Sequence, residues 1–343
     1  MKRDGCLHLL RTGFRGHRRK LLRKFGVFKL LDAPKNFASQ IRSAQAAWQV
    51  AWQRDISAVY WQLYPKTLRV CKFLRNLELV AWFLLAWDAS KQYRVSWLRK
   101  LMLAMRIIGN RNKVTALTFW PEQLWLAKEV LRVPATLKGD VVECGSYFGA
   151  STASLSLVCA LTGRRLIVCD TFEGLPPVRP DEKYDIIGDC YYAWECGDFA
   201  ADIEDVKRNV EVHGVIEVCR FVKGNFAETL RNLNDVESVV LVFEDADLRS
   251  SVEQGLRWLW PKLADGCKFA THEAWSVPVV SIFFDKRWWR SNLKTEPPGF
   301  YGSGTGTRTE LGYAVKVNKK KLLASNRRRC HLGCRGYSAT REA

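Results

Sequence analysis

One stretch of the chain combines an acid with two glycines in a pattern that suits ligand binding. Residues 141–151 read VVECGSYFGAS, so Glu143 stands two positions before the first glycine. Glycines let the backbone approach a ligand closely, and a helix that starts after them supplies free N–H groups. The spacing differs from the phosphate-binding Gly-x-Gly-x-x-Gly pattern, and Glu143 would attract a cation rather than a pyrophosphate. Taken alone, the motif also fits a tight turn with a solvated glutamate.

A second acid follows the next apolar run. Asp170 comes directly after residues 166–169, which are Leu-Ile-Val-Cys. In doubly wound sheets an acid at this place commonly binds the hydroxyls of a ribose. Two acids on either side of a glycine turn suit a nucleoside that carries positive charge. This pair of acids therefore predicts S-adenosylmethionine as the cofactor.

A further group of ionisable residues follows two later apolar runs. Its members are Glu244, Asp245, Asp247, His272 and Glu273. Like charges so close together are costly unless a cation or a proton lies among them. Open α/β sheets bind their ligands at the ends of such strands, so this group is the second candidate site.

Both groups require a fold that brings the ends of several strands to one edge. Apolar runs predict strands over residues 141–144, 166–169, 220–222, 239–243, 267–270 and, after a Gly/Thr-rich turn, 313–317. Stretches whose apolar residues recur at helical spacing separate these strands, and they cover residues 151–161, 202–212 and 250–263. Apolar strands that alternate with helices predict an α/β fold with a mostly parallel, doubly wound sheet covered on both faces.

Four blocks of the sequence resemble the macrocin O-methyltransferase family in order and spacing. They are GDVVECG, DTFEGLP, EDVKRN and FVKGNFAETL, which begin at residues 139, 170, 204 and 221. Family members are class I, metal-dependent sugar methyltransferases with a Rossmann-like sheet closed by an antiparallel last strand. The resemblance, over residues 139–275, implies methyl transfer from S-adenosylmethionine to a hydroxyl of a small molecule, sugar or glycan.

The resemblance also implies a role for each cofactor-binding residue. The residues on the methionine side of S-adenosylmethionine would be Glu143, Gly145, Gly149 and Ser151. Asp170 would bind the ribose, and the residues along the adenine would be Gly224, Asn225 and Phe226. For Phe226 a second interpretation stays open, because an aromatic residue after a strand usually packs in the core.

A divalent metal, Mg²⁺ or Mn²⁺, is implied by the same resemblance. Asp245 and Asp247 match the two aspartates of the family pattern Asp-Gly-Asp-Leu-Tyr-Glu-Ser, whereas Arg249 stands in place of its tyrosine. Relatives carry paired acids where this chain has His272 and Glu273, and imidazole leans toward softer ions than Mg²⁺. A metal bound by Asp245, His272 and Glu273, with Asp247 as a further candidate ligand, would lower the pKa of an acceptor hydroxyl. Without a metal, His272 or Glu273 is the candidate general base, or His272 is only a hydrogen-bonded strand-end residue.

The formal net charge of +19 is concentrated at the two ends of the 343-residue chain. Residues 1–115 contain 24 basic and 5 acidic residues, and residues 316–343 contain 9 and 1. Residues 116–315 contain 21 basic and 29 acidic residues, which suits a site for a cationic sulfonium and a divalent metal. A hydrophobic content of 48% excludes disordered and collagen-like chains.

These patterns divide the chain into four predicted regions. Residues 1–36 form a basic arm, disordered or amphipathic, and residues 37–137 form a helical region that could cover the cofactor. A methyltransferase domain follows over 138–318, and a basic tail over 319–343. Within the helical region Trp120-Pro121-Glu122 opens a helix, because proline suits a first turn and an acid favours the positive helix end.

The basic ends leave several partners open. They could be solvated arms, pack on a second copy in a homo-oligomer, or contact an anionic membrane surface or nucleic acid. An organelle-targeting role is also open. An alternative function is therefore a nucleic-acid- or membrane-associated protein built on a methyltransferase scaffold. With no transmembrane segment, no clean secretory signal and scattered cysteines, we expect the protein in the cytoplasm, and a place at the periphery of a membrane stays open.

Overall fold

The computed structural model of the chain describes residues 77–302 with short gaps, together with residues 309 and 311–317. The gaps are residues 87, 89–90, 111–112 and 188–189. The predicted basic arm over 1–36 and the predicted tail over 319–343 lie outside the described residues. So does most of the first half of the predicted helical region.

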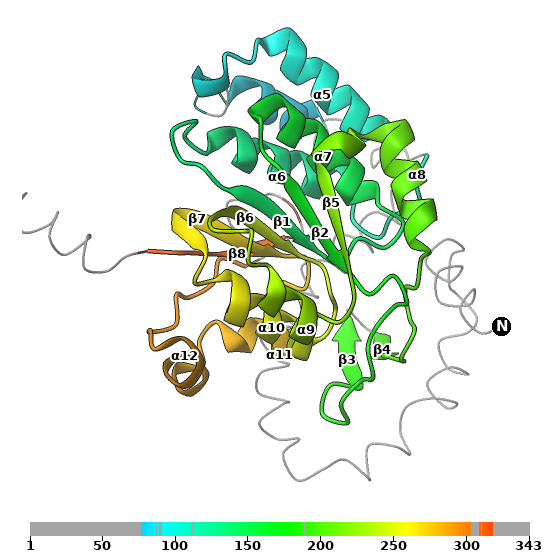
Figure 1. Ribbon diagram of the computed structural model, residues 1–343, viewed down its shortest axis with the longest axis vertical. Coiled ribbons are helices and arrows are strands. Elements are labelled where there is room, and N and C mark those ends of the chain that lie inside the picture. The colour runs from blue at the N-terminus through cyan, green and yellow to red at the C-terminus, as the bar shows by residue number, and fades with distance from the viewer. Residues whose placement is uncertain are drawn as a thin grey trace, which may run out of the picture. The chain divides into compact units, whose positions relative to one another are not determined.

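A six-stranded sheet forms the centre of the described part (Figure 1). Its strands are β1 (Asp140–Cys144), β2 (Leu166–Asp170), β5 (Cys219–Lys223), β6 (Val239–Glu244), β7 (Leu263–Thr271) and β8 (Gly312–Val315). The order is β5-β2-β1-β6-β7-β8, and all neighbours are parallel except β8, which is antiparallel to β7. The predicted α/β class, with a mostly parallel sheet and an antiparallel last strand, is confirmed.

Helices cover both faces of this sheet (Figure 1). On one face lie α5 (Trp97–Asn110), α6 (Trp120–Arg132), α7 (Ala150–Thr162) and α8 (Ile203–His213). On the other lie α9 (Phe226–Thr229), α10 (Arg249–Leu259), α11 (Val277–Ile282) and α12 (Lys286–Leu293). Among the described helices none is long and apolar enough to span a membrane.

A helical stretch also covers residues 77–85, and several shorter elements lie elsewhere in the described chain. A separate two-stranded sheet pairs β3 (Tyr184–Ile187) with β4 (Cys190–Ala193). Three single 3₁₀ turns are η3 (Lys91–Tyr93), η4 (Ile216–Val218) and η5 (Leu230–Asn232). The elements β3, β4, α9, α11 and α12 were not predicted from the sequence, because each is too short to display a hydrophobic period.

The start of α6 follows from its sequence. Pro121 occupies the first turn, and the backbone nitrogen of Phe119 donates to Glu122 Oε2 at 2.9 Å. The predicted helix opening at Trp120-Pro121-Glu122 is therefore confirmed.

The boundary between α10 and β7 differs from the prediction. The helix was expected to continue to residue 263, but it ends at Leu259, just before Pro261, which has no N–H to continue it. The strand then begins at Leu263, four residues before the predicted start at 267. Its first half contains Asp265 and Gly266, whose polarity hid it from an apolar-run search.

The core encloses the sheet because the strands are apolar on both faces. All five residues of β1 and all six of β6 are buried, as expected for parallel strands covered twice. Helix α7 is buried from Ala150 to Cys159, since α5 and α6 pack outside it. The order of the strands reverses at β1, and the loops that leave β1, β2 and β6 meet there.

Candidate functional site

The loop between β1 and α7 passes so close to the end of β6 that it requires glycine. Gly145 has a φ of +88°, and a Cβ at this position would overlap the carbonyl oxygen of Asp245. Gly149 caps α7 with a φ of +84°, and a Cβ there would press on Val206 of α8. The helix therefore begins directly at the loop, where its first N–H groups have no partner within the helix.

Asp170, at the end of β2, holds this loop in place. Its Oδ2 accepts hydrogen bonds from the backbone nitrogen of Ser146 at 2.6 Å, from the Ser146 hydroxyl at 3.0 Å and from the nitrogen of Tyr147 at 3.3 Å. Its Oδ1 accepts from the nitrogen of Phe172 at 2.8 Å. One carboxylate thus fixes both the β1–α7 loop and the turn after β2.

Glu143 is a fully buried carboxyl beside the same loop. Its exposure is 0%, and neither of its oxygens has a hydrogen bond of normal geometry to any residue that the structure describes. Burial, with smaller contributions from Asp245 and Asp170, raises its pKa to about 8, although the nearby Ser151 and Thr152 hydroxyls lower it. A buried acid without a hydrogen-bond partner costs free energy, and a cationic ligand group would remove that cost.

The residues predicted along the adenine lie on the other side of Asp170. The backbone nitrogen of Gly224 donates to the Asp170 carbonyl at 2.9 Å. The Asn225 side chain caps α9 by accepting from the nitrogen of Ala227 at 2.9 Å. Phe226 is 8% exposed and belongs to the hydrophobic core, the interpretation that the sequence had left open. A contact of these residues with adenine stays a prediction.

The ends of β6 and β7 bring the second group of ionisable residues together. Glu244 pairs with Thr271 in the register of the two strands, so Asp245 and His272 follow side by side. Asp245 Oδ1 lies 3.3 Å from His272 Nδ1. One ligand atom from each of Asp245, His272 and Glu273 lies within 4.8 Å of the others, which is close enough for a single metal ion. The predicted set of three residues is thus brought together.

Protonation in this group is set by burial and by mutual charge. Burial alone would lower the pKa of His272, but Asp245 and then Glu273 raise it to about 10. Burial raises the pKa of Glu273 to about 8, helped by Asp245, whereas His272 and the Thr271 hydroxyl lower it. At neutral pH the His272 ring is therefore protonated and positively charged, and its Nδ1 faces Asp245 Oδ1. Its Nε2 is buried and has no hydrogen-bond partner within the described part of the chain.

Asp247 adjoins the three residues without belonging to the group within 4.8 Å. It has a φ of +59°, in the left-handed region, and its nitrogen donates to Glu273 Oε1 at 3.3 Å. Burial, and then Glu273, raises the pKa of its carboxyl well above the usual range. Arg249 is held by Glu253 at 2.9 Å and lies 3.7 Å from Asp285.

Several residues at this edge were not predicted. Ser146 and Thr271 lie inside or beside the quoted motifs, but nothing in the pattern shows that Ser146 would bind Asp170 or that Thr271 would bind Glu273. Asp185, the second residue of β3, accepts a hydrogen bond from the Ser276 hydroxyl at 2.6 Å. Its partner is 91 residues away, so no local signal could have revealed the pair.

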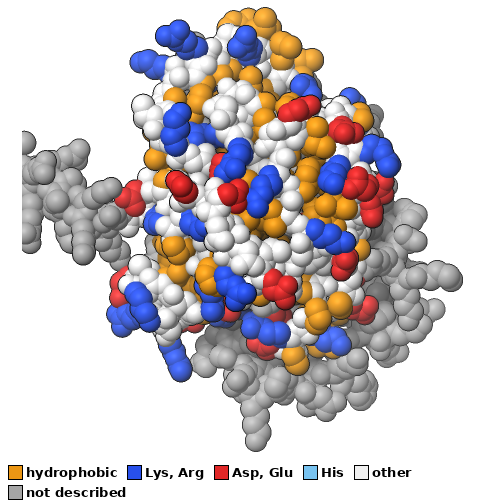
Figure 2. Space-filling model, in the orientation of Figure 1, with side chains coloured by type: hydrophobic (Ala, Val, Ile, Leu, Met, Phe, Trp, Pro, Cys, Tyr) orange, Lys and Arg blue, Asp and Glu red, His pale blue; other side chains and the backbone are white. Residues whose placement is uncertain are grey.

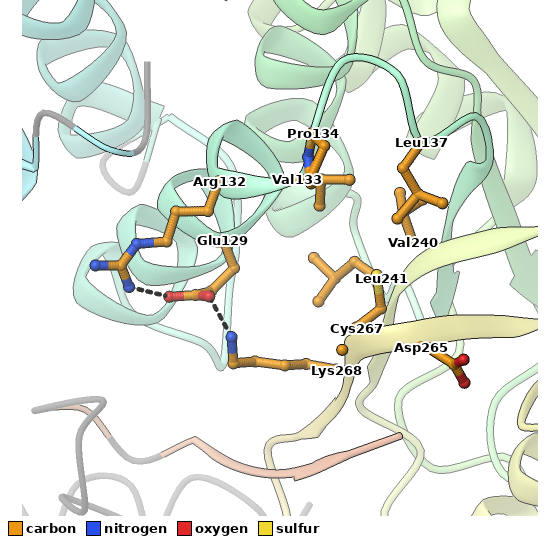
Figure 3. A pocket seen from close by; sticks show the side chains of 11 residues that line it. Glu129, Arg132, Val133, Pro134, Leu137, Val240, Leu241, Asp265, Cys267 and Lys268 are labelled. Carbon is orange, nitrogen blue, oxygen red and sulfur yellow. Dashed lines mark hydrogen bonds and ion pairs between the residues drawn. The ribbon is translucent and has the colours of Figure 1, made fainter. Parts of the chain in front are cut away.

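A hollow of about 300 Å³ lies elsewhere, near the amino end of β6 (Figure 3). Figure 3 shows three of its charged groups turned toward one another, since Glu129 is 3.0 Å from Arg132 and 2.6 Å from Lys268, whereas Asp265 points away from them. None of the predicted site residues lines this hollow. Glu129, Arg132 and Lys268 satisfy one another, so this cluster does not point to a ligand.

Comparisons with known proteins agree with the predicted resemblance. Residues 125–286 match the family described as macrocin-O-methyltransferase (TylF). A curated relative, the 8-demethyl-8-(2,3-dimethoxy-alpha-L-rhamnosyl)-tetracenomycin-C 4'-O-methyltransferase of Streptomyces olivaceus, is 32% identical over 132 residues. The alignment covers 37% of this chain and 50% of the relative, so the chain spans about half the length of the relative that it matches.

The fold has a counterpart among solved structures. The structure of the O-methyltransferase NovP superposes with a TM-score of 0.52 at 18% sequence identity. The match covers 64% of this chain and 99% of NovP. This similarity shows that the described part of the chain has the fold of that protein.

Proposed function

Because residues 125–286 match the macrocin O-methyltransferase family, we propose that the chain is an S-adenosylmethionine-dependent O-methyltransferase. Its acceptor in this proposal is a hydroxyl of a sugar or another small molecule. The observation that carries the proposal is the convergence at one sheet edge of the glycine loop, the unpaired carboxyl of Glu143 and the group Asp245, His272 and Glu273.

The cofactor side of the edge fits a cationic nucleoside. When bound, S-adenosylmethionine supplies a methyl group on a positively charged sulfur, which an oxygen nucleophile can attack in line. Glu143 would ionise against the positive charge of the ligand and orient it, because no described residue makes a hydrogen bond of normal geometry to its carboxyl oxygens. Asp170 would keep the β1–α7 loop in shape and accept hydrogen bonds from the ribose. Gly145 and Gly149 leave room for the backbone to approach.

The acceptor side has a donor set that fits a divalent metal. The unpartnered Nε2 of His272 and the two carboxylates within 4.8 Å are the supporting observations. Asp245, His272 and Glu273 would hold the ion, which would supply Lewis acidity that lowers the pKa of an acceptor hydroxyl. Because His272 has a pKa of about 10, ion binding must displace its proton, so affinity should rise with pH.

Proton transfer without a metal would fall to Glu273 rather than His272. A histidine with a pKa of about 10 already holds its proton at neutral pH and cannot accept another. Glu273, with a pKa of about 8, is ionised above that pH and could take the acceptor proton on Oε1 or Oε2. The His272 proton would then remain between Nδ1 and Asp245 and keep the two side chains aligned.

A sugar hydroxyl is the acceptor class that we favour. The curated relative is named for a rhamnosyl compound and for O-methylation at its 4' position. That name concerns the relative, and this chain matches only half of it, so the acceptor is proposed by analogy.

The proposal is tested by incubating the full chain with S-adenosylmethionine, Mn²⁺ and a panel of deoxysugar glycosides, and following S-adenosylhomocysteine by mass spectrometry. We expect S-adenosylhomocysteine to form only when a glycoside is present and only when the chain retains Asp245. Methyl transfer to an amine or to nucleic acid alone would contradict the proposed acceptor class. The alternative of a nucleic-acid-associated protein concerns mainly the basic ends, which lie outside the described residues.

A further inference from the structure

The helix α5 exposes an apolar face that the fold does not use. Trp97, Leu98, Met102 and Met105 are 64%, 53%, 57% and 63% exposed, respectively. They recur at helical spacing along the outward side of the helix, and together they are called the α5 surface here. Side chains of this size are seldom left in water as one continuous stripe unless they contact something.

The inward side of α5 already meets the needs of folding. Leu103, Ala104 and Ile107 are buried against the rest of the core. Lys100 extends its Nζ to the carbonyls of Leu84 and Ala86 at 2.9 and 2.8 Å. The helix is thus fixed by its other face, and the α5 surface contributes nothing to the core.

Positive charge surrounds the α5 surface. Arg94, Arg99 and Arg106 are exposed beside it. No Asp or Glu occurs between residues 89 and 121. In Figure 2 hydrophobic side chains with Lys and Arg beside them cover the upper end of the molecule, where Figure 1 places α5. A partner must therefore accept apolar side chains and carry negative charge.

Charge argues against two other occupants of the α5 surface, a second copy of the chain and the chain's own residues 1–76. A second copy docked by the same face would bring two acid-free, arginine-flanked helices together. Residues 1–76 contain 17 basic and 3 acidic residues and would also meet like charge. Nucleic acid would satisfy the arginines but would leave Trp97 and the methionines without apolar surroundings.

We propose that the α5 surface docks on an anionic lipid bilayer. The helix would lie in the plane of the interface, with Leu98, Met102 and Met105 among the acyl chains and Trp97 at the level of the headgroups. The flanking arginines would meet the negative surface potential of the lipids. This binding is peripheral. It would place the proposed methyl transfer at a membrane surface, which the residues of the catalytic edge do not indicate.

The test is sedimentation of the full chain with vesicles of phosphatidylcholine and phosphatidylserine. Met102→Glu is compared with Phe284→Glu, because both side chains are 57% exposed and both changes add one negative charge. Phe284 lies just after α11, on the other side of the sheet. We expect Met102→Glu to weaken partitioning by about tenfold, the scale of keeping one Met side chain out of apolar surroundings, and Phe284→Glu to weaken it much less.

Depth of insertion gives a second readout that the basic ends cannot mimic. The fluorescence of Trp97 is obtained as the difference between the native chain and Trp97→Phe. Brominated lipids should quench this difference. Equal partitioning of Met102→Glu and Phe284→Glu, or no quenching of Trp97, would overturn the proposal. A fall in the free energy of unfolding of Met102→Glu with unchanged partitioning would show that the chain itself covers this face. A dimer that Met102→Glu dissociates would assign it to a second copy.

Discussion

Replacing Glu143 with glutamine should stabilise the free protein and weaken its binding of cofactor. The carboxyl is fully buried, has no hydrogen-bond partner and has a pKa of about 8, against 4.5 for a free glutamate. Glutamine has nearly the same shape and cannot ionise. The two effects have opposite signs because the feature that destabilises the fold is the one that we propose binds the ligand.

The magnitude follows from proton linkage. The folded pKa of Glu143 lies above the unfolded pKa, so the unfolded chain loses this proton first and stability falls as pH rises from 4.5 to about 8. One pKa unit corresponds to about 1.4 kcal/mol, which amounts to roughly 3 kcal/mol at pH 7. Glu143→Gln should remove this loss, and its advantage over the native chain should grow by about 1.4 kcal/mol per pH unit between pH 5 and 8.

Urea denaturation across that pH range measures the first effect, and calorimetry with S-adenosylhomocysteine measures the second. The cofactor affinity should fall by about tenfold or more, because a charge-assisted contact becomes a neutral one. Glu244→Gln is the matched control. Glu244 is equally buried and unpaired, but Glu143 pairs with Phe243 in the strand register, so Glu143 and Glu244 point to opposite faces of the sheet.

The control variant should therefore gain stability without losing cofactor affinity. If Glu143→Gln destabilised the protein at every pH, the inference that the buried carboxyl of Glu143 is unpaired and costs stability would be refuted. If its cofactor affinity equalled that of Glu244→Gln, the assignment of Glu143 to the cofactor site would be refuted.

Other substitutions probe the rest of the structure. Asp170→Ala should lower the cofactor affinity and should also lower the free energy of unfolding by about 3 kcal/mol, because the Asp170 carboxylate accepts several hydrogen bonds. Calorimetry measures the first effect and denaturation the second. An unchanged cofactor affinity would count against the ribose role of Asp170. Asp245→Ala should abolish turnover while cofactor still binds, and full activity after exhaustive chelation would remove the metal from the account. Lys128→Met should stabilise the protein by about 2–4 kcal/mol near pH 7.5, because burial lowers the pKa of Lys128 to about 7 and stability is lost as pH falls from 10.5 toward that value. A less stable Lys128→Met variant in urea would show that the contact of its Nζ with the Trp82 ring outweighs burial.

The sheet could be predicted because its strands are continuous apolar runs. β1, β2 and β6 are buried on both faces, so most of their residues are hydrophobic and the pattern stands out. β7 could be predicted only in part, because its first half bulges away from β6 and carries polar residues. The short helices α11 and α12 depend on capping by Ser276 and Asp285, which a hydrophobic period does not reveal.

The candidate site could be predicted where it depends on strand ends alone. Asp245, His272 and Glu273 follow neighbouring parallel strands, and strand order is enough to bring them together. The contacts of Asp170 depend on the conformation of the β1–α7 loop, with Tyr147 at a positive φ, and could not be foreseen from spacing. The protonation of His272 depends on burial and on the 3.3 Å approach of Asp245, which only the folded chain shows.

The central claim is that the edge formed by β1, β2 and β6 binds S-adenosylmethionine. Calorimetric titration of the full chain with S-adenosylhomocysteine tests it most directly, with Asp170→Ala and Glu244→Gln titrated alongside. We expect one binding site per chain, weakened by Asp170→Ala and preserved in Glu244→Gln. No binding to the native chain, or binding that Asp170→Ala leaves unchanged, would contradict it.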